Sequence, residues 1–263
     1  MAFWVAFDHL GKLLIVNILC STALLGMAAV VWAGVGPLIP VRGTPVLFTG
    51  WIALSAAVLF VGAAATAAMV RECIDTRDGS LSAFFRGLRR HGLPAGCIGF
   101  LYALAGLSLT YSAWYYLTGR SGMPLLLGYA LAVGAAWLIL GWLLLGFVVT
   151  PLLIYRPAGM GSTLRLACLL ILDNPLYLGG CGLCTFLVSA CTLLLPPLWI
   201  CFSLAPVVVL QCSAYEMLAR RYAALEKAGV VGVARRRVQV DFDDANDDYL
   251  NRGFRDLIFP WKS

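Results

Sequence analysis

Charged side chains are scarce in this sequence. They make up 12% of its 263 residues, whereas an ordinary soluble domain has about 25%. Hydrophobic residues make up 61%, and the mean hydropathy is +0.88. A water-soluble fold cannot bury so much apolar surface, so the composition excludes a soluble globular protein and predicts an integral membrane protein.

Residues that perform chemistry are also few. The only histidines are His9 and His91, and no set of His, Asp and Glu residues has the spacing of metal ligands. The sequence contains no Gly-x-x-x-x-Gly-Lys-Ser/Thr phosphate-binding loop and no Gly-x-Ser-x-Gly nucleophile motif. We therefore predict no enzymatic activity, no cofactor and no metal site. The polar residues inside apolar segments are scattered: Asn17, Ser55, Thr66, Ser189 and Gln211.

Asn17 and the cysteines have simple structural interpretations. Asn17 lies inside a long apolar segment, where a hydrogen bond to a neighbouring helix is its expected role. Of the nine cysteines, eight lie in or close to apolar segments and Cys73 lies in a basic loop. We expect these cysteines to be unpaired packing residues, including Cys181 and Cys184, despite their redox-motif spacing.

Six apolar segments approach the roughly 20 residues that cross a bilayer. They predict an all-α, polytopic membrane helical bundle, with a transmembrane domain over 1–218 and a charged cytoplasmic tail over 219–263. The second segment is rich in Ala and Gly, so we expect it inside the bundle. The predicted spans are 13–32, 46–70, 93–117, 125–150, 175–195 and 198–218.

The region 164–195 allows two interpretations. Asp173-Asn174-Pro175 has the composition of a helix start, which favours a second surface helix over 162–172 followed by a separate span. The alternative is one long, kinked helix that begins at Leu164. A carboxylate at the centre of a membrane helix costs about 2.5–3.5 kcal/mol, so we prefer the two-helix interpretation.

The basic residues are distributed unevenly along the chain. Of 19 Lys and Arg residues, 17 lie at Lys12, in 71–91, in 156–165 or after Leu218. Arg42 and Arg120 are the other two. Basic loops remain on the cytoplasmic side, so this pattern predicts that both termini are cytoplasmic. The net charge of +6 follows from this distribution, and we expect no nucleic-acid partner.

The basic amphipathic loop over 71–92 overlaps the most distinctive stretch of the chain, 78–94. Its apolar residues follow helical spacing, and three arginines lie on the other side of the predicted helix. We expect a helix over 80–91 that lies flat on the bilayer, with Ser80 as N-cap and Pro94 separating it from the next span. The apolar stripe is Leu81, Phe84, Phe85 and Leu88, and the basic side is Arg86, Arg89 and Arg90.

The end of the tail combines large apolar groups with charges. A segment exposed to water has no need for these apolar residues, so we expect the tail to dock on the cytoplasmic face or the membrane surface. Phe259 and Trp261 are its candidate docking residues.

Four segments resemble the YesL-like family of bacterial membrane proteins, which is built around a domain of unknown function. They are FDHLGKLLIVNIL, RECIDTRDGSLSAFFRGLRRHGLPA, STLRLACLLILDNPLYLGG and the terminal FRDLIFPWK. The resemblance implies a multi-pass protein of the bacterial cytoplasmic (inner) membrane, often associated with carbohydrate uptake and utilisation. It implies no catalytic residues. We therefore expect an accessory protein whose partners are the lipid bilayer and carbohydrate-transport components or a second copy of itself.

A second resemblance offers an alternative function. Glu72, Asp78-Gly79-Ser80 and Leu93-Pro94 resemble the loop through which permeases of the ABC type dock their ATPase subunit. Here Leu93-Pro94 lies two positions too late, and Cys73-Ile74 replaces the expected pair of alanines. This resemblance implies a permease-type transporter subunit that docks through 78–94. Either function makes the following the candidate interfacial or partner-docking residues: Asp78, Gly79, Phe84, Phe85, Arg86, Arg89, Arg90, Phe259 and Trp261.

Overall fold

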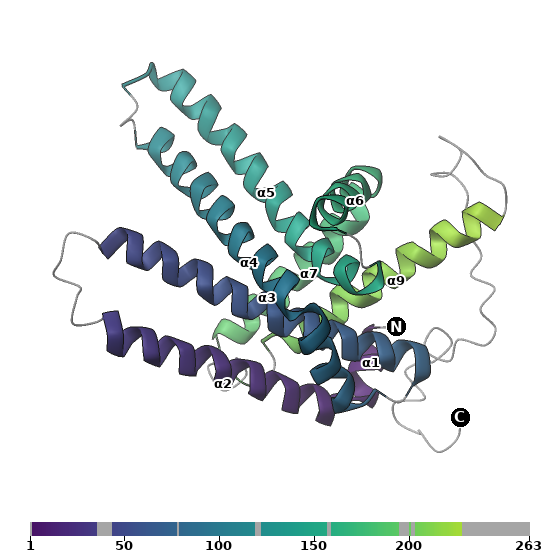
Figure 1. The fold of residues 1–263 in the computed structure, drawn as a ribbon. Helices are drawn as coiled ribbons and strands as arrows, with labels where there is room; N and C mark the ends of the chain where they lie inside the picture. The colour runs from purple at the N-terminus through teal and green to yellow at the C-terminus, as the bar shows by residue number, and fades with distance from the viewer. Residues whose placement is uncertain are drawn as a thin grey trace.

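The protein is an all-α, polytopic helical bundle (Figure 1). The computed structural model describes residues 2–35, 44–77, 79–118, 122–156, 159–194, 200 and 203–227, and these contain no β-strand. This confirms the predicted fold class. The helices are α1 (Ala2–Asp8), α2 (Leu10–Val35), α3 (Thr44–Thr76), α4 (Leu81–Leu117), α5 (Leu125–Tyr155), α6 (Met160–Asp173), α7 (Pro175–Leu194) and α9 (Ala205–Lys227).

Five of the described helices are long and apolar enough to cross a membrane. They contain the first four predicted spans and the fifth as far as Leu194, which makes the chain a multi-pass membrane protein. The sixth predicted span is described only from Ala205, as the first part of α9, and 195–199 and 201–202 lie outside the described residues. The number six therefore stays a prediction. The five apolar segments are Leu10–Val30, Phe48–Thr76, Leu81–Leu117, Leu125–Tyr155 and Pro175–Thr192.

Helix α3 lies inside the bundle, as its small residues predicted. Ala64, Ala65 and Ala67 are at most 1% exposed, and α3 makes its most extensive contact with α4. On α4, Gly87 and Gly99 face this contact, where an added Cβ would meet α3 atoms within 3 Å. Small side chains allow helices in lipid to approach closely, so these residues determine how α3 and α4 pack.

Helix α9 contacts α1, α2, α3, α5 and α7, which gives it a central place in the bundle. Val208, Val209 and Cys212 are fully or almost fully buried. Its first turn is bound by Asn17 of α2, whose side-chain oxygen accepts hydrogen bonds from the N–H groups of Leu204 (2.8 Å) and Ala205 (3.0 Å). The predicted helix–helix hydrogen bond of Asn17 is thus confirmed.

The region 164–195 forms two helices, as preferred from the sequence. Helix α6 ends at Asp173 and α7 begins at Pro175, with Asn174 between them. Tyr222 of α9 binds this junction: its hydroxyl donates to the Asp173 carboxylate and accepts a hydrogen bond from Asn174 Nδ2 at 2.6 Å. The junction is therefore attached to α9 by side chains as well as by apolar packing.

The separate surface helix expected over 80–91 does not exist. Residues 80–91 instead form the N-cap and first turns of α4, which continues through Pro94 to Leu117. A proline inside a helix costs about 3 kcal/mol because it removes a hydrogen bond and crowds the preceding turn. Pro94 is exposed, however, and Ala95 and Ile98 after it are buried in the core together with Phe84 before it. The packing of these residues in the core therefore outweighs the tendency of Pro94 to end the helix.

Candidate docking site at the basic end

The end of α3, the start of α4, α6 and the last turns of α9 lie at the same end of the bundle (Figure 1). This basic end carries the described arginines, whereas the described residues at the opposite end, where α4 ends and α5 begins, include no Lys or Arg. Arg42 and Arg120 lie outside the described residues. The arginines of the basic end are Arg71, Arg77, Arg86, Arg89, Arg90, Arg156, Arg165, Arg220 and Arg221.

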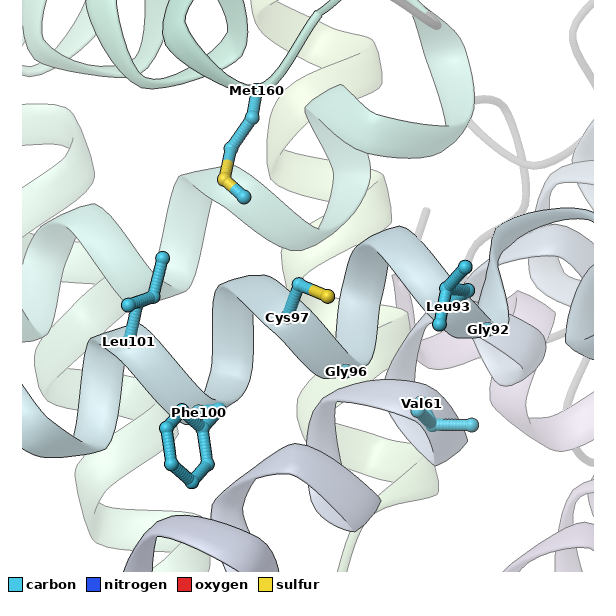
Figure 2. A pocket seen from close by; sticks show the side chains of 8 residues that line it. All are labelled: Val61, Gly92, Leu93, Gly96, Cys97, Phe100, Leu101 and Met160. Carbon is cyan, nitrogen blue, oxygen red and sulfur yellow. The ribbon is translucent and has the colours of Figure 1, made fainter.

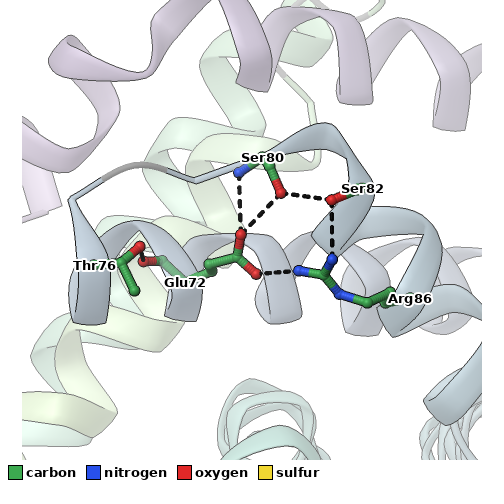
Figure 3. Close-up of polar contacts among 5 residues, drawn as sticks. All are labelled: Glu72, Thr76, Ser80, Ser82 and Arg86. Carbon is green, nitrogen blue, oxygen red and sulfur yellow. Dashed lines mark hydrogen bonds and ion pairs between the residues drawn. The ribbon is translucent and has the colours of Figure 1, made fainter.

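A closed ring of hydrogen bonds braces the α3–α4 turn (Figure 3). Glu72 accepts a hydrogen bond from Ser80 Oγ at 2.9 Å and pairs with Arg86 Nη2 at 2.6 Å. Arg86 Nη1 also donates to Ser82 Oγ at 3.0 Å, and Ser82 Oγ lies 2.7 Å from Ser80 Oγ. Because the Ser80 proton goes to Glu72, Ser82 donates to Ser80. Such rings strengthen each member by mutual polarisation.

Ser80 is the N-cap of α4, as predicted, but its hydroxyl does not cap the helix. The hydroxyl binds Glu72 instead, so it joins α4 to α3. Gly79 is buried, and a Cβ at this position would collide with the Cys73 sulfur atom. Gly79 therefore contributes to closing the turn rather than to an exposed docking surface. Asp78 lies outside the described residues.

The predicted apolar stripe of this segment is divided between two surroundings. Phe84 is only 5% exposed and packs in the core of the protein, whereas Phe85 is 56% exposed. Arg86 belongs to the ring described above, and Arg89 and Arg90 are exposed beside it. The structure thus brings these five predicted residues together on the first turns of α4. Phe259 and Trp261 lie outside the described residues.

Sequence reasoning missed a second polar cluster at this end. The Arg71 guanidinium lies 4.9 Å from the centre of the Tyr155 ring and donates to the Ile154 carbonyl at 2.9 Å. It also pairs with Asp75 at 3.4 Å. Tyr155 in turn packs on Tyr215 of α9, with ring centres 4.9 Å apart. In the sequence, Arg71 and Tyr155 look like ordinary residues at the ends of apolar segments, so no local signal could have joined them.

One recess, on α4, is apolar and has a volume of about 720 Å³ (Figure 2). Its lining side chains include Val61, Phe100, Leu101 and Met160, and the single thiol of Cys97 is the one ionisable group among them. A second recess, of about 640 Å³, lies between α6 and α9 with Arg156 and Asp173 in its lining. Among the described residues, no group of His, Cys, Asp and Glu could hold a metal ion.

No protein-family model matches this chain, and no curated protein or solved structure is similar to it. The resemblance to the YesL-like family therefore stays a prediction that rests on the four segments quoted above.

Proposed function

We propose that this protein is a non-enzymatic accessory protein of the bacterial cytoplasmic membrane that binds a partner protein at its basic end. The ring formed by Glu72, Ser80, Ser82 and Arg86 is the observation that carries the proposal. This ring holds the first turn of α4 against α3 and so fixes the helix backbone from which the exposed side chain of Arg89 projects. A fixed, charged surface loses less conformational entropy on binding than a flexible loop would.

The cavities also favour docking over catalysis. The large recess on α4 is apolar, and the polar side chains of the described span interiors do not converge on it. An enzyme would need a nucleophile, base or electrophile gathered at one concave site. Thr66 and Ser189, by contrast, each donate to a carbonyl of their own helix.

The geometry supports the ABC-permease alternative less well than it supports the accessory role. A docking loop of that type presents a surface helix to the ATPase subunit, whereas residues 81–94 are the beginning of a membrane helix that packs along α3. Gly79 is buried and unavailable for a partner. We therefore keep the accessory role as the proposal. The association with carbohydrate uptake, and a second copy of the chain as an alternative partner, rest on the family resemblance.

Charge reversal at Arg89 tests the docking role. Purification from native membranes should recover a partner with the wild-type protein, and Arg89→Glu should reduce that recovery severalfold because a surface charge changes sign. Arg165→Glu is the matched control, since Arg165 is also exposed but belongs to α6 and not to the first turns of α4. Equal recovery with Arg89→Glu and wild type would contradict docking at this surface. A stable complex with an ATPase subunit would favour the permease instead.

The carbohydrate role needs a separate test in cells. We expect a strain that lacks the gene to take up at least one sugar more slowly, and the wild-type gene to restore uptake. Normal uptake across a panel of sugars, with no transport component among the co-purified proteins, would contradict this part of the proposal.

A further inference from the structure

A small polar cavity lies at the basic end, between α3, α4 and the end of α5. Its volume is about 280 Å³. The charged and polar side chains in its lining come from two helices, with Arg71 and Glu72 on α3 and Arg86, Arg90 and His91 on α4. Ile154 of α5 also lines it. This cavity therefore has several hydrogen-bond donors around a small volume.

The lining carries more positive than negative charge. Three arginines face one carboxylate, and that carboxylate, Glu72, is already paired with Arg86 at 2.6 Å and bound by Ser80. Arg71 uses Nη1 for the Ile154 carbonyl and Nε for Asp75. Its Nη2 group remains available within the described part of the chain. An anion that enters the cavity would therefore offset the excess positive charge of its lining.

Arg90 is the residue best able to bind such an anion. It forms no hydrogen bond or ion pair with any of the described residues, although its neighbours Arg86 and Arg71 do. Guanidinium groups match the geometry of phosphate oxygens and bind them through paired hydrogen bonds. His91 adds a ring nitrogen that can donate a further hydrogen bond.

We propose that this cavity binds a phosphate group, either in the headgroup of an anionic lipid or as a free phosphate ion. Its place at the end of the membrane-crossing part of α3, beside an exposed Phe85, is compatible with the depth of lipid headgroups. The inference goes beyond the proposed docking role, because it concerns the side chains that line the cavity and does not involve Arg89.

Adjacent arginines provide a matched test. Arg89 and Arg90 are both exposed and carry the same charge, but only Arg90 lines the cavity. Full-length protein in detergent would be titrated with sodium phosphate, using sodium chloride at equal ionic strength as reference. In a second arm, protein in phosphatidylcholine vesicles with and without phosphatidic acid would be analysed for bound lipid by native mass spectrometry.

We expect Arg90→Gln to weaken phosphate or phosphatidic acid binding by about tenfold, because a charged hydrogen bond is lost. Arg89→Gln should change binding by less than about twofold, since this side chain lies outside the cavity. Binding of phosphatidic acid that inorganic phosphate does not displace would identify a lipid site, and saturation by inorganic phosphate alone would identify a free-ion site. Equal weakening by the two variants would overturn the proposal. So would the absence of any preference for phosphate over chloride in the first arm together with no bound phosphatidic acid in the second.

Loss of phosphate binding in Arg90→Gln can be distinguished from loss of the docking role. The partner-recovery experiment uses Arg89→Glu, whose side chain is outside the cavity. If partner recovery does not depend on Arg89, the phosphate titration can still be interpreted. If phosphate does not bind, the partner-recovery result still tests the docking role.

Discussion

At the scale of single residues, Asn17 is the clearest structural determinant. It is fully buried in the first membrane helix, donates to the Ile200 carbonyl at 2.7 Å, and accepts from the N–H groups of Leu204 and Ala205. The N–H groups at a helix start have no partner within their own helix. One amide therefore satisfies the start of α9 from another helix, nearly 190 residues away in sequence.

We predict that Asn17→Ala lowers the free energy of unfolding by about 1–3 kcal/mol, because it leaves buried backbone groups unsatisfied. Ser55→Ala is the control, since Ser55 Oγ donates to the Trp51 carbonyl of its own helix. Denaturant-induced unfolding in mixed micelles would measure both. Equal, small effects of the two substitutions would show that Asn17 does not anchor α9.

Tyr222 makes one contact of the fold sensitive to pH. It lies beyond the apolar part of α9, where burial and the hydrogen bond to Asp173 raise its pKa above the ordinary value. The folded state therefore favours the neutral phenol. Its stabilising effect is complete below the pKa of the unfolded chain, about 10, and is lost as the pH rises through the higher pKa of the folded state.

We expect the melting temperature of wild-type protein to fall more steeply in this alkaline range than that of Tyr222→Phe, which has no phenol to ionise. Tyr129→Phe, at an exposed position on α5, should keep the wild-type slope. Thermal unfolding followed by circular dichroism at a series of pH values would check this. The same slope in all three proteins would contradict the assigned role of Tyr222.

At the scale of elements, the contact between α3 and α4 depends on glycine. A Cβ on Gly99 would lie 2.7 Å from Phe60 Cβ and 2.8 Å from the Ala56 carbonyl oxygen. Both distances are shorter than those that real Cβ atoms make, and the Ala56 carbonyl oxygen belongs to the backbone. The two helices would have to separate to accept even a methyl group.

Gly99→Ala should therefore destabilise the protein by about 1–3 kcal/mol through overpacking. Gly134→Ala, on α5, has no neighbouring atom within 4 Å of the added Cβ. It should be neutral or slightly stabilising, because alanine favours a helix by up to about 1 kcal/mol over glycine. Unfolding measurements on the pair would show the difference, and a destabilising effect of similar size at both positions would contradict close packing of α3 on α4.

Adjacent phenylalanines on α4 have different surroundings. We expect Phe84→Ala to cost about 2 kcal/mol or more, because it leaves a cavity in the core. Phe85→Ala should have little effect on unfolding, since Phe85 is 56% exposed on the outside of the bundle. The same unfolding experiment compares them directly. A larger loss for Phe85→Ala would favour the flat surface helix that we first expected from the sequence.

Local signals predicted some elements correctly and missed others. Asp173-Asn174-Pro175 correctly indicated a break, because the cost of a carboxylate in lipid and the turn preference of these residues act in the same direction. Pro94 was misleading, because the contacts of Phe84 and Ile98 with the core determine whether α4 continues. The cavity at the basic end was also missed, since Arg71 and Ile154 are 83 positions apart and meet only in the folded bundle.

At the scale of the whole molecule, the two ends of the bundle differ in charge. The described arginines lie where α3 ends and α4 begins, and around α6 and the last turns of α9. The end where α4 meets α5 has aromatic and apolar side chains instead, including Trp114 and Leu126. A one-sided distribution of this kind orients proteins in membranes, so we predict that the proposed docking surface and phosphate cavity face the cytoplasm.

Thiol labelling of intact cells tests this arrangement most directly. Arg89→Cys and Met123→Cys introduce exposed thiols at opposite ends of the bundle, and mass spectrometry of peptides would locate a maleimide that cannot cross the membrane. We predict that Met123→Cys is labelled in intact cells, whereas Arg89→Cys is labelled only after the membrane is opened. Labelling of Arg89→Cys in intact cells would place the basic end outside and contradict the proposed function.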